Sequence, residues 1–346
     1  MRRLLARSTV AALIAAPVVL LAVQGAPGTA GLAAKSAAPS AKVVAAARAN
    51  FVKTMSTHAT EVGTGGVSPG GVDHGAGALH GSAGTVTADQ SYNWSGYADT
   101  ESGTKTVSGV TGSWIMPAVT CPTAPYQNSD AFLANWIGVD GFTNGTVEQL
   151  GSGAQCYEGV TYYYVWYEMY PANTVEEGTT ACINDNVNCP QPGDRLTASI
   201  KVTPAGSGEN NYTVSLVDLT HRDESFSTTQ QCATDVCADA NAEWIVERPA
   251  TEIDNIIQIL PAADFDRTYF TAGTVTSGSR LTDIQGFKDG PVYDIAMIDD
   301  TASYILACVD QPAPPGTLLS ATSTTSCPAA SPTSVGGFEE SWDAGF

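Results

Sequence analysis

Apolar and polar residues alternate along most of the chain. The segment RLTASIKVT places Leu196, Ala198, Ile200 and Val202 on one face and polar residues on the other, which is the pattern of a half-buried β-strand. Segments rich in aromatic and β-branched residues are also typical of strands, and they include NYTVSLVDLT, YYYVWYEMYP, NAEWIVE, TYFTAGTV, VYDIAMID and SYILACV. Their spacing predicts one all-β domain over residues 89–346, a large antiparallel sandwich or barrel. The final segment is less regular, and we expect it to pack only as an edge.

The N-terminus has the order of a secretory signal peptide. Arginines at positions 2, 3 and 7 precede the apolar run VAALIAAPVVLLAV and the small residues GAPGTAGLAA. We therefore predict a signal peptide over 1–34 and a secreted protein. Residues 35–88 are predicted to be a pro-segment, with an Ala-rich, partly helical part followed by a Gly-rich linker. No later apolar run is long enough to cross a bilayer, so no membrane association is expected after the signal is removed.

Charge divides the chain into two parts. The first 88 residues carry 7 of the 15 basic residues and 2 of the 35 acidic ones, which leaves 8 basic and 33 acidic residues, a formal charge of −25, for 89–346. So acidic a domain disfavours nucleic acid as a partner. Its self-repulsion weakens when carboxylates are protonated, which suits an acidic medium. The basic pro-segment could dock on this domain as an inhibitor.

Cysteine and histidine usage narrows the chemistry. All eight cysteines follow the linker, and an even count in an exported chain predicts four disulfides. Of the four histidines only His221 lies in the domain, in a polar, turn-like stretch. A Ser-His-Asp triad and a His-rich zinc site are therefore disfavoured, and we expect no metal or cofactor. We expect the pairs Cys182–Cys189, Cys232–Cys237, Cys121–Cys156 and Cys308–Cys327.

Carboxylate chemistry remains. The segment NAEWIVERP reads as a strand that places Glu243, Ile245 and Glu247 on one face and Trp244 and Val246 on the other. With the tryptophan and valine in the core, the two glutamates face either water or a cleft.

A second acidic segment, TEIDNIIQ, begins like the E-I-D-x-x-E strand of laminarinase-like glycosidases. The last acid of that pattern is Ile257 here. A β-sandwich glycoside hydrolase using Glu252, Asp254 and another acid is therefore one alternative function. A non-catalytic, lectin-like binding module is another.

Six motifs in order resemble the glutamic peptidases, the eqolisin family of secreted acid proteases. They are SYNWSGY (91–97), GSWIMP (112–117), ANWIGVDG (134–141), VEQLGSG (147–153), VWYEMYP (165–171) and NAEWIVE (241–247). Each motif is weak alone, but six in order with fitting gaps are specific. By this resemblance the chain is identified as a secreted, bacterial member of the family.

The resemblance implies a fold and a site. The fold would be an antiparallel two-sheet β-sandwich, a lectin-like jelly roll with a concave sheet that forms the cleft. The catalytic pair would be Gln149 and Glu247. The sequence departs from the family beside the glutamine, where Glu148 and Leu150 flank it, and Glu148 should point away from the cleft. The implied cleft-lining residues are Trp136, Asp140, Glu168 and Tyr170.

The implied activity is that of an acid endopeptidase that hydrolyses protein and peptide substrates. Glu247 would take a proton from water and later return it to the leaving amine, and Gln149 would donate an N–H to the oxyanion. A carboxylate base has an ordinary pKa near 4, so such a site works in acid. We expect a monomer whose partners are its substrates and, as an inhibitor, its own pro-segment.

Overall fold

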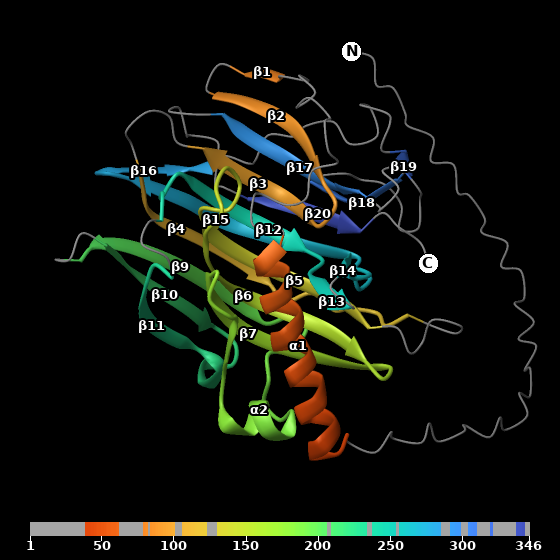
Figure 1. Ribbon diagram of the computed structural model, residues 1–346. Helices are drawn as coiled ribbons and strands as arrows, with labels where there is room; N and C mark the ends of the chain where they lie inside the picture. The colour runs from red at the N-terminus through yellow and green to blue at the C-terminus, as the bar shows by residue number, and fades with distance from the viewer. Residues whose placement is uncertain are drawn as a thin grey trace, which may run out of the picture. The chain divides into compact units, whose positions relative to one another are not determined.

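The computed structural model describes residues 39–61, 79–81, 84–100, 106–122, 130–205, 209–233, 237–253, 256–284, 291–298, 304–309, 319–320 and 337–342. Within them the chain is mostly β-strand, as the alternating pattern predicts. Eighteen of the described strands form one continuous hydrogen-bonded network, which we describe as a front sheet and a back sheet joined along one edge (Figure 1). The predicted signal peptide and most of the Gly-rich linker lie outside the described residues.

The front sheet carries the residues of the resemblance. Its pairs are antiparallel except β2 with β17, which is parallel. Strand β2 runs across the expected domain boundary at 88/89, which itself stays a prediction. In spatial order the sheet consists of β1 (Leu79–Gly81), β2 (Gly84–Ser91), β17 (Val292–Ile298), β3 (Trp94–Thr100), β12 (Asn241–Glu247), β5 (Ala131–Val139), β6 (Val147–Tyr157), β7 (Val160–Tyr170) and β8 (Val175–Glu177).

The back sheet is joined to the front sheet through the pairing of β17 with β18. Strand β20 pairs with β15 on one side and β18 on the other, so the expectation that the tail packs only as an edge is wrong. Strand β16 (Arg280–Asp283) continues β15 as a hairpin. In spatial order the back sheet consists of β19 (Leu319–Ser320), β18 (Tyr304–Val309), β20 (Phe338–Trp342), β15 (Arg267–Ser277), β4 (Val107–Ile115), β9 (Arg195–Pro204), β10 (Asn210–Asp218) and β11 (Phe226–Gln231).

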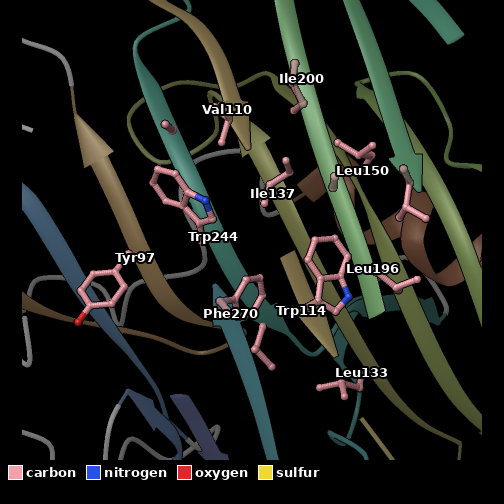
Figure 2. Close-up of a cluster of buried hydrophobic side chains, with 14 of the residues drawn as sticks. Tyr97, Val110, Trp114, Leu133, Ile137, Leu150, Leu196, Ile200, Trp244 and Phe270 are labelled. Carbon is pink, nitrogen blue, oxygen red and sulfur yellow. The ribbon is translucent and has the colours of Figure 1, made fainter. Parts of the chain in front are cut away.

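The core lies between the two sheets (Figure 2) and takes alternate residues from each strand. Trp244 and Ile137 come from the front sheet and meet Trp114 and Ile200 of the back sheet. Two indole N–H groups form hydrogen bonds between the front and the back sheet. Trp244 donates to the Thr111 carbonyl at 2.7 Å, and Trp114 donates to the Ser152 hydroxyl at 2.8 Å. Because the inner face of each strand is used in this way, the other face of the front sheet is left for the site.

That second surface, the outer face of the front sheet, is also covered. Every residue of β12 is buried on both sides, unlike a strand with one solvated face. A second cluster of buried side chains lies here and includes Trp94, Trp136 and Ile245 together with residues of helix α1 (Ala41–Glu61). Figure 1 shows α1 crossing the strands β5 to β7. The helix expected within the pro-segment therefore packs on the sheet.

The remaining elements are short. Helix α2 (Thr180–Asp185), which the sequence pattern did not predict, is capped by the Thr179 hydroxyl. The 3-10 turn η1 (Arg222–Glu224) follows β10, and β13 (Ala250–Ile253) with β14 (Ile256–Ile259) forms a separate two-stranded hairpin. In the described part of the chain, neither helix has the length and apolar character that a membrane span requires.

Three of the four expected disulfides are present: Cys121–Cys156, Cys182–Cys189 and Cys232–Cys237. The expected partner of Cys308, at position 327, lies outside the described residues, so that pairing stays a prediction.

Candidate active site

Glu247 is the last residue of β12 and lies on the outer face of the front sheet. Its neighbours across the sheet are Trp94 on β3 and Ala134 on β5. Its side chain is fully buried, as is that of Ile245 on the same face. The alternation of the strand sends Trp244 and Val246 into the core behind it. The strand therefore holds one carboxylate against the outer face with a packed core as its support.

Three N–H donors converge on the Glu247 carboxylate. Trp94 Nε1 at 2.7 Å and Asn93 Nδ2 at 3.2 Å both donate to Oε1, and Trp136 Nε1 donates to Oε2 at 2.7 Å. The two indole rings meet edge to face with centroids 5.0 Å apart, which fixes both donors. An ionised carboxylate only accepts hydrogen bonds, so this cage suits the charged form.

Two of these donors were missed in the sequence. Trp136 was predicted as a site residue, and the structure brings it into contact with Glu247. Asn93 and Trp94 were not singled out, although both lie in the quoted motif SYNWSGY. The only available signal was an indole and an amide next to each other in a family motif.

Gln149 and Glu168 face each other across β6 and β7. Gln149 Nε2 donates to Glu168 Oε2 at 2.7 Å, and the Thr174 hydroxyl donates to Glu168 Oε1 at 2.8 Å. Burial raises the pKa of Glu168 to about 8; these two hydrogen bonds pull the pKa down, and the Glu247 charge adds to the rise. The influence of the Glu247 charge on Glu168 is the electrostatic link between Glu247 and the glutamine–glutamate pair.

Glycines make room for the tryptophan of the site. A Cβ on Gly151, which lies opposite Trp136, would be 2.2 Å from the Asn135 carbonyl oxygen and 2.7 Å from Trp136 Cβ. A Cβ on Gly138 would be 2.7 Å from the Trp136 ring. Both distances are too short for any other residue without displacement. Gly151 therefore allows the close approach of the β5 backbone at Asn135 and Trp136, and Gly138 leaves room for the Trp136 ring.

Asp140 anchors a loop at the end of β5. It accepts hydrogen bonds from the backbone N–H groups of Asp239 and Ala240 and from Asn144 Nδ2, each at 2.7 Å. Burial raises its pKa against the lowering effect of these bonds. Its structural neighbour Glu243 is fully buried, and burial followed by the Asp140 charge raises the pKa of Glu243 well above its usual range.

The two remaining expected positions are also placed. Tyr170, the last residue of β7, lies opposite Val147 and is buried in the outer-face cluster. Glu148 points inward, opposite to Gln149, as the strand alternation predicts. There it contacts the Cys237 sulfur, and burial raises its pKa well above the usual range.

Helix α1 packs on the sheet face that carries Glu247. The Phe51 ring stacks on Tyr164 with centroids 3.9 Å apart, in the space that Gly153 leaves open. Gly153 lies opposite Ala134, which lies opposite Glu247, so Phe51 sits two strands away, about 10 Å. Four apolar side chains of the helix are buried on this face: Val44, Ala47, Phe51 and Met55.

A buried arginine, Arg48, also anchors the helix, close to the ring on which Phe51 stacks. Arg48 forms an ion pair with Glu176 on β8 and donates from Nη2 to the Cys182 carbonyl at 2.7 Å. Its guanidinium also lies 5.0 Å from the centroid of the Tyr164 ring. Burial lowers its pKa, and nearby tyrosines and Glu224 oppose that change.

Two groups among the described residues bring three potential metal ligands together. One contains Glu148 with the disulfide-bonded Cys232 and Cys237, whose sulfurs are not free thiolates. The other joins Asp194, Asp218 and the exposed His221. Neither group includes Glu247 or Gln149.

Comparisons with known proteins bear on the fold and the family of the chain. The crystal structure of scytalido-glutamic peptidase with a peptide-based transition-state analogue is similar, at 19% identity and a TM-score of 0.50, covering 72% of this chain and 98% of that one. Aspergilloglutamic peptidase from Aspergillus niger is 22% identical, with a TM-score of 0.39 and coverages of 61% and 99%. A search of curated proteins gave no match. The model of the peptidase A4 family matches residues 92–309, and the chain therefore belongs to that family.

Proposed function

We propose that the protein is a secreted acid endopeptidase of the glutamic type, in which Glu247 is the general base and Gln149 the oxyanion donor. The observation that carries the proposal is the cage of three N–H donors around Glu247, on the same sheet face as the Gln149 amide. The cage holds the Glu247 carboxylate in a fixed orientation. In an acidic medium a carboxylate can act as the general base that removes a proton from the attacking water.

In the proposed reaction, Glu247 first accepts a proton from water and later donates it to the leaving amine. A Glu247 oxygen takes a proton from water while the water oxygen adds to the carbonyl carbon of the peptide bond. The carbonyl oxygen becomes an oxyanion, and the Gln149 amide donates an N–H to it. Glu247 then gives its proton to the amide nitrogen, the C–N bond breaks, and a carboxylic acid and an amine leave.

Protein or peptide is the supported substrate class. The chain belongs to a peptidase family, and the similar scytalido-glutamic peptidase structure contains a peptide-based analogue. We expect the side chains that contact the substrate to determine which peptide bonds are preferred. Three disulfides and the secretory order of the N-terminus support an extracellular location.

The test is activity on a denatured protein at about pH 3 to 5. We expect Glu247→Gln to lower kcat by about 10²–10⁴-fold and Gln149→Ala by about 10²–10³-fold, with the fold intact by circular dichroism. Matched controls are Glu177→Gln on β8 and Gln230→Ala on β11, which remove the same groups away from the cage. Near wild-type turnover in either site variant refutes the assigned pair.

The glycoside hydrolase alternative has less support. Its residue Glu252 lies in the separate β13–β14 hairpin, outside both large sheets. Side-by-side assays on a denatured protein and on a β-glucan distinguish the two activities. Glucan hydrolysis that survives Glu247→Gln would favour the alternative, and binding of glycans without any hydrolysis would favour the lectin-like module.

The N-terminal segment is proposed to be an inhibitory pro-segment. Its helix α1 is seated on the outer face, with Phe51 two strands from Glu247 and Arg48 paired to Glu176. Carboxylates take up protons near pH 4, so acid weakens ion pairs of this kind. N-terminal sequencing before and after acidification tests the proposal: we expect cleavage after α1 together with a rise in activity. Full activity of a chain that keeps α1 would refute inhibition.

A further inference from the structure

Glu168 is a buried carboxyl that the proposed chemistry does not use. It is fully buried, and each of its oxygens accepts one hydrogen bond: Oε2 from the Gln149 amide and Oε1 from the Thr174 hydroxyl. It lies directly opposite Gln149 on the neighbouring strand. Its contact is therefore with the amide that should serve the oxyanion.

The other end of the Gln149 amide has no partner. Its Oε1 atom is buried and accepts no hydrogen bond from the described part of the chain. A buried carbonyl without a hydrogen-bond partner destabilises this orientation, because its lost hydration is not replaced. A half-turn about the Cγ–Cδ bond exchanges Oε1 and Nε2 with almost no change in shape. The rotated amide would present Oε1 to Glu168 and carry Nε2 to the side now held by Oε1.

Protonation of Glu168 decides between the two orientations. Burial raises its pKa to about 8, so the group is a neutral carboxylic acid in an acidic medium. Because the Thr174 hydroxyl donates to Oε1, the proton belongs on Oε2, the oxygen that faces Gln149. An O–H and an N–H would then oppose each other. The rotated amide removes this conflict, since Oε2–H donates to the Gln149 carbonyl.

We propose that neutral Glu168 is a positioning residue that holds the Gln149 carbonyl and so releases both amide hydrogens for the oxyanion. Ionised Glu168 accepts one N–H from Nε2 instead, which keeps Nε2 on the Glu168 side and leaves Oε1 facing the oxyanion. The residues facing Glu168 are the neutral Gln149 on β6 and Thr174 after β7, and the charge that reaches it is that of Glu247 on β12. The inference rests on the proposed role of Gln149 and adds a proton switch to it.

The test is the pH profile of kcat for Glu168→Gln and Glu168→Ala. A glutamine can donate to the Gln149 carbonyl and accept from Thr174, but it cannot ionise. We expect wild-type kcat to fall with an apparent pKa of about 8. Glu168→Gln should keep acid kcat within about threefold and lose that basic limb. Glu168→Ala should lower kcat by about 10²-fold at every pH with little change in KM, since the amide is no longer held.

Thr174→Val supplies a second test with a change of similar shape. The Thr174 hydrogen bond lowers the pKa of Glu168, so its removal should move the basic limb of kcat upward by about 0.5–1 pH unit. If Glu168 had only a structural role, Thr174→Val would not shift the basic limb of kcat. If the limb stays in place in Thr174→Val, or if Glu168→Gln keeps it, the proposal is wrong.

Glu148→Gln is the matched control. It removes a buried carboxyl next to Gln149 in sequence but on the opposite face of β6. It should keep the wild-type basic limb of kcat, measured only where circular dichroism shows the fold intact. Loss of the limb in this control would show that the limb does not come from Glu168 and would overturn the inference. If Gln149→Ala keeps near wild-type turnover, the proposed function is wrong. If Gln149→Ala loses turnover but Glu168→Gln keeps the basic limb of kcat, only the proton switch is wrong.

Discussion

Rising pH should destabilise the fold through its buried carboxyls, and Glu168 allows the magnitude to be worked out. Its pKa is about 8 in the folded protein, against an ordinary value of 4.5 for a glutamate in water. Below about 4.5 both the folded and unfolded states hold the proton. Between the two values only the folded state keeps it, so stability is lost as pH rises from about 4.5 towards 8.

The expected loss is large. The two pKa values differ by about 3.5, and each unit corresponds to about 1.4 kcal/mol, which makes about 5 kcal/mol for this one side chain. The whole stability of a domain is about 5–15 kcal/mol. Glu148 and Glu243 are shifted in the same direction and add to the loss. The substitution Glu168→Gln should therefore remove about 5 kcal/mol of the pH dependence.

The assay is urea unfolding at about pH 4 and pH 8, followed by the fluorescence of the buried tryptophans. Both chains should carry Glu247→Gln, which prevents digestion of the unfolded protein. That background removes the smallest of the four influences on the Glu168 pKa and leaves burial, the largest. We expect the unfolding free energy to fall by about 5 kcal/mol less in the Glu168→Gln chain, because Glu148 and Glu243 remain in both chains. If the two chains lose the same free energy between these pH values, the reasoning from burial is refuted.

Three further outcomes are expected. Arg48→Ala should speed acid processing of the N-terminal segment, seen by mass spectrometry, because the buried ion pair is lost; unchanged processing would contradict its anchoring role. Gly151→Ala should cost about 1–3 kcal/mol in denaturant unfolding and lower kcat, because its Cβ displaces Trp136; wild-type kcat would show that the tryptophan tolerates the shift. Removing Cys121–Cys156, with a separation of 35 residues, should cost about 4 kcal/mol, and about 2 kcal/mol more than removing Cys232–Cys237, with a separation of 5; equal costs would argue against a loop-entropy origin.

Strand alternation predicted the sheet face on which the candidate site residues lie, because alternation is a local property. Parity along NAEWIVE and VEQLGSG was enough to place Glu247 and Gln149 on the outer face and Glu148 inside. Local proximity was also enough for the two short disulfides. The prediction that the tail packs only as an edge was wrong, because β20 is held by its pairing with β15 and β18 and its own sequence pattern is irregular.

The tertiary structure alone decided what surrounds each proposed catalytic group. Asn93 donates to Glu247 across 154 residues of sequence, and Phe51 reaches Tyr164 from a segment expected only to be a pro-region. The protonation of Glu168 depends on its complete burial, which no pattern within VWYEMYP measures. The sequence by itself determined which faces of the strands carry polar groups, since alternation is a property of neighbouring residues. Partners and pKa values depend on distances between strands far apart in the chain, so only the folded sheet decided them.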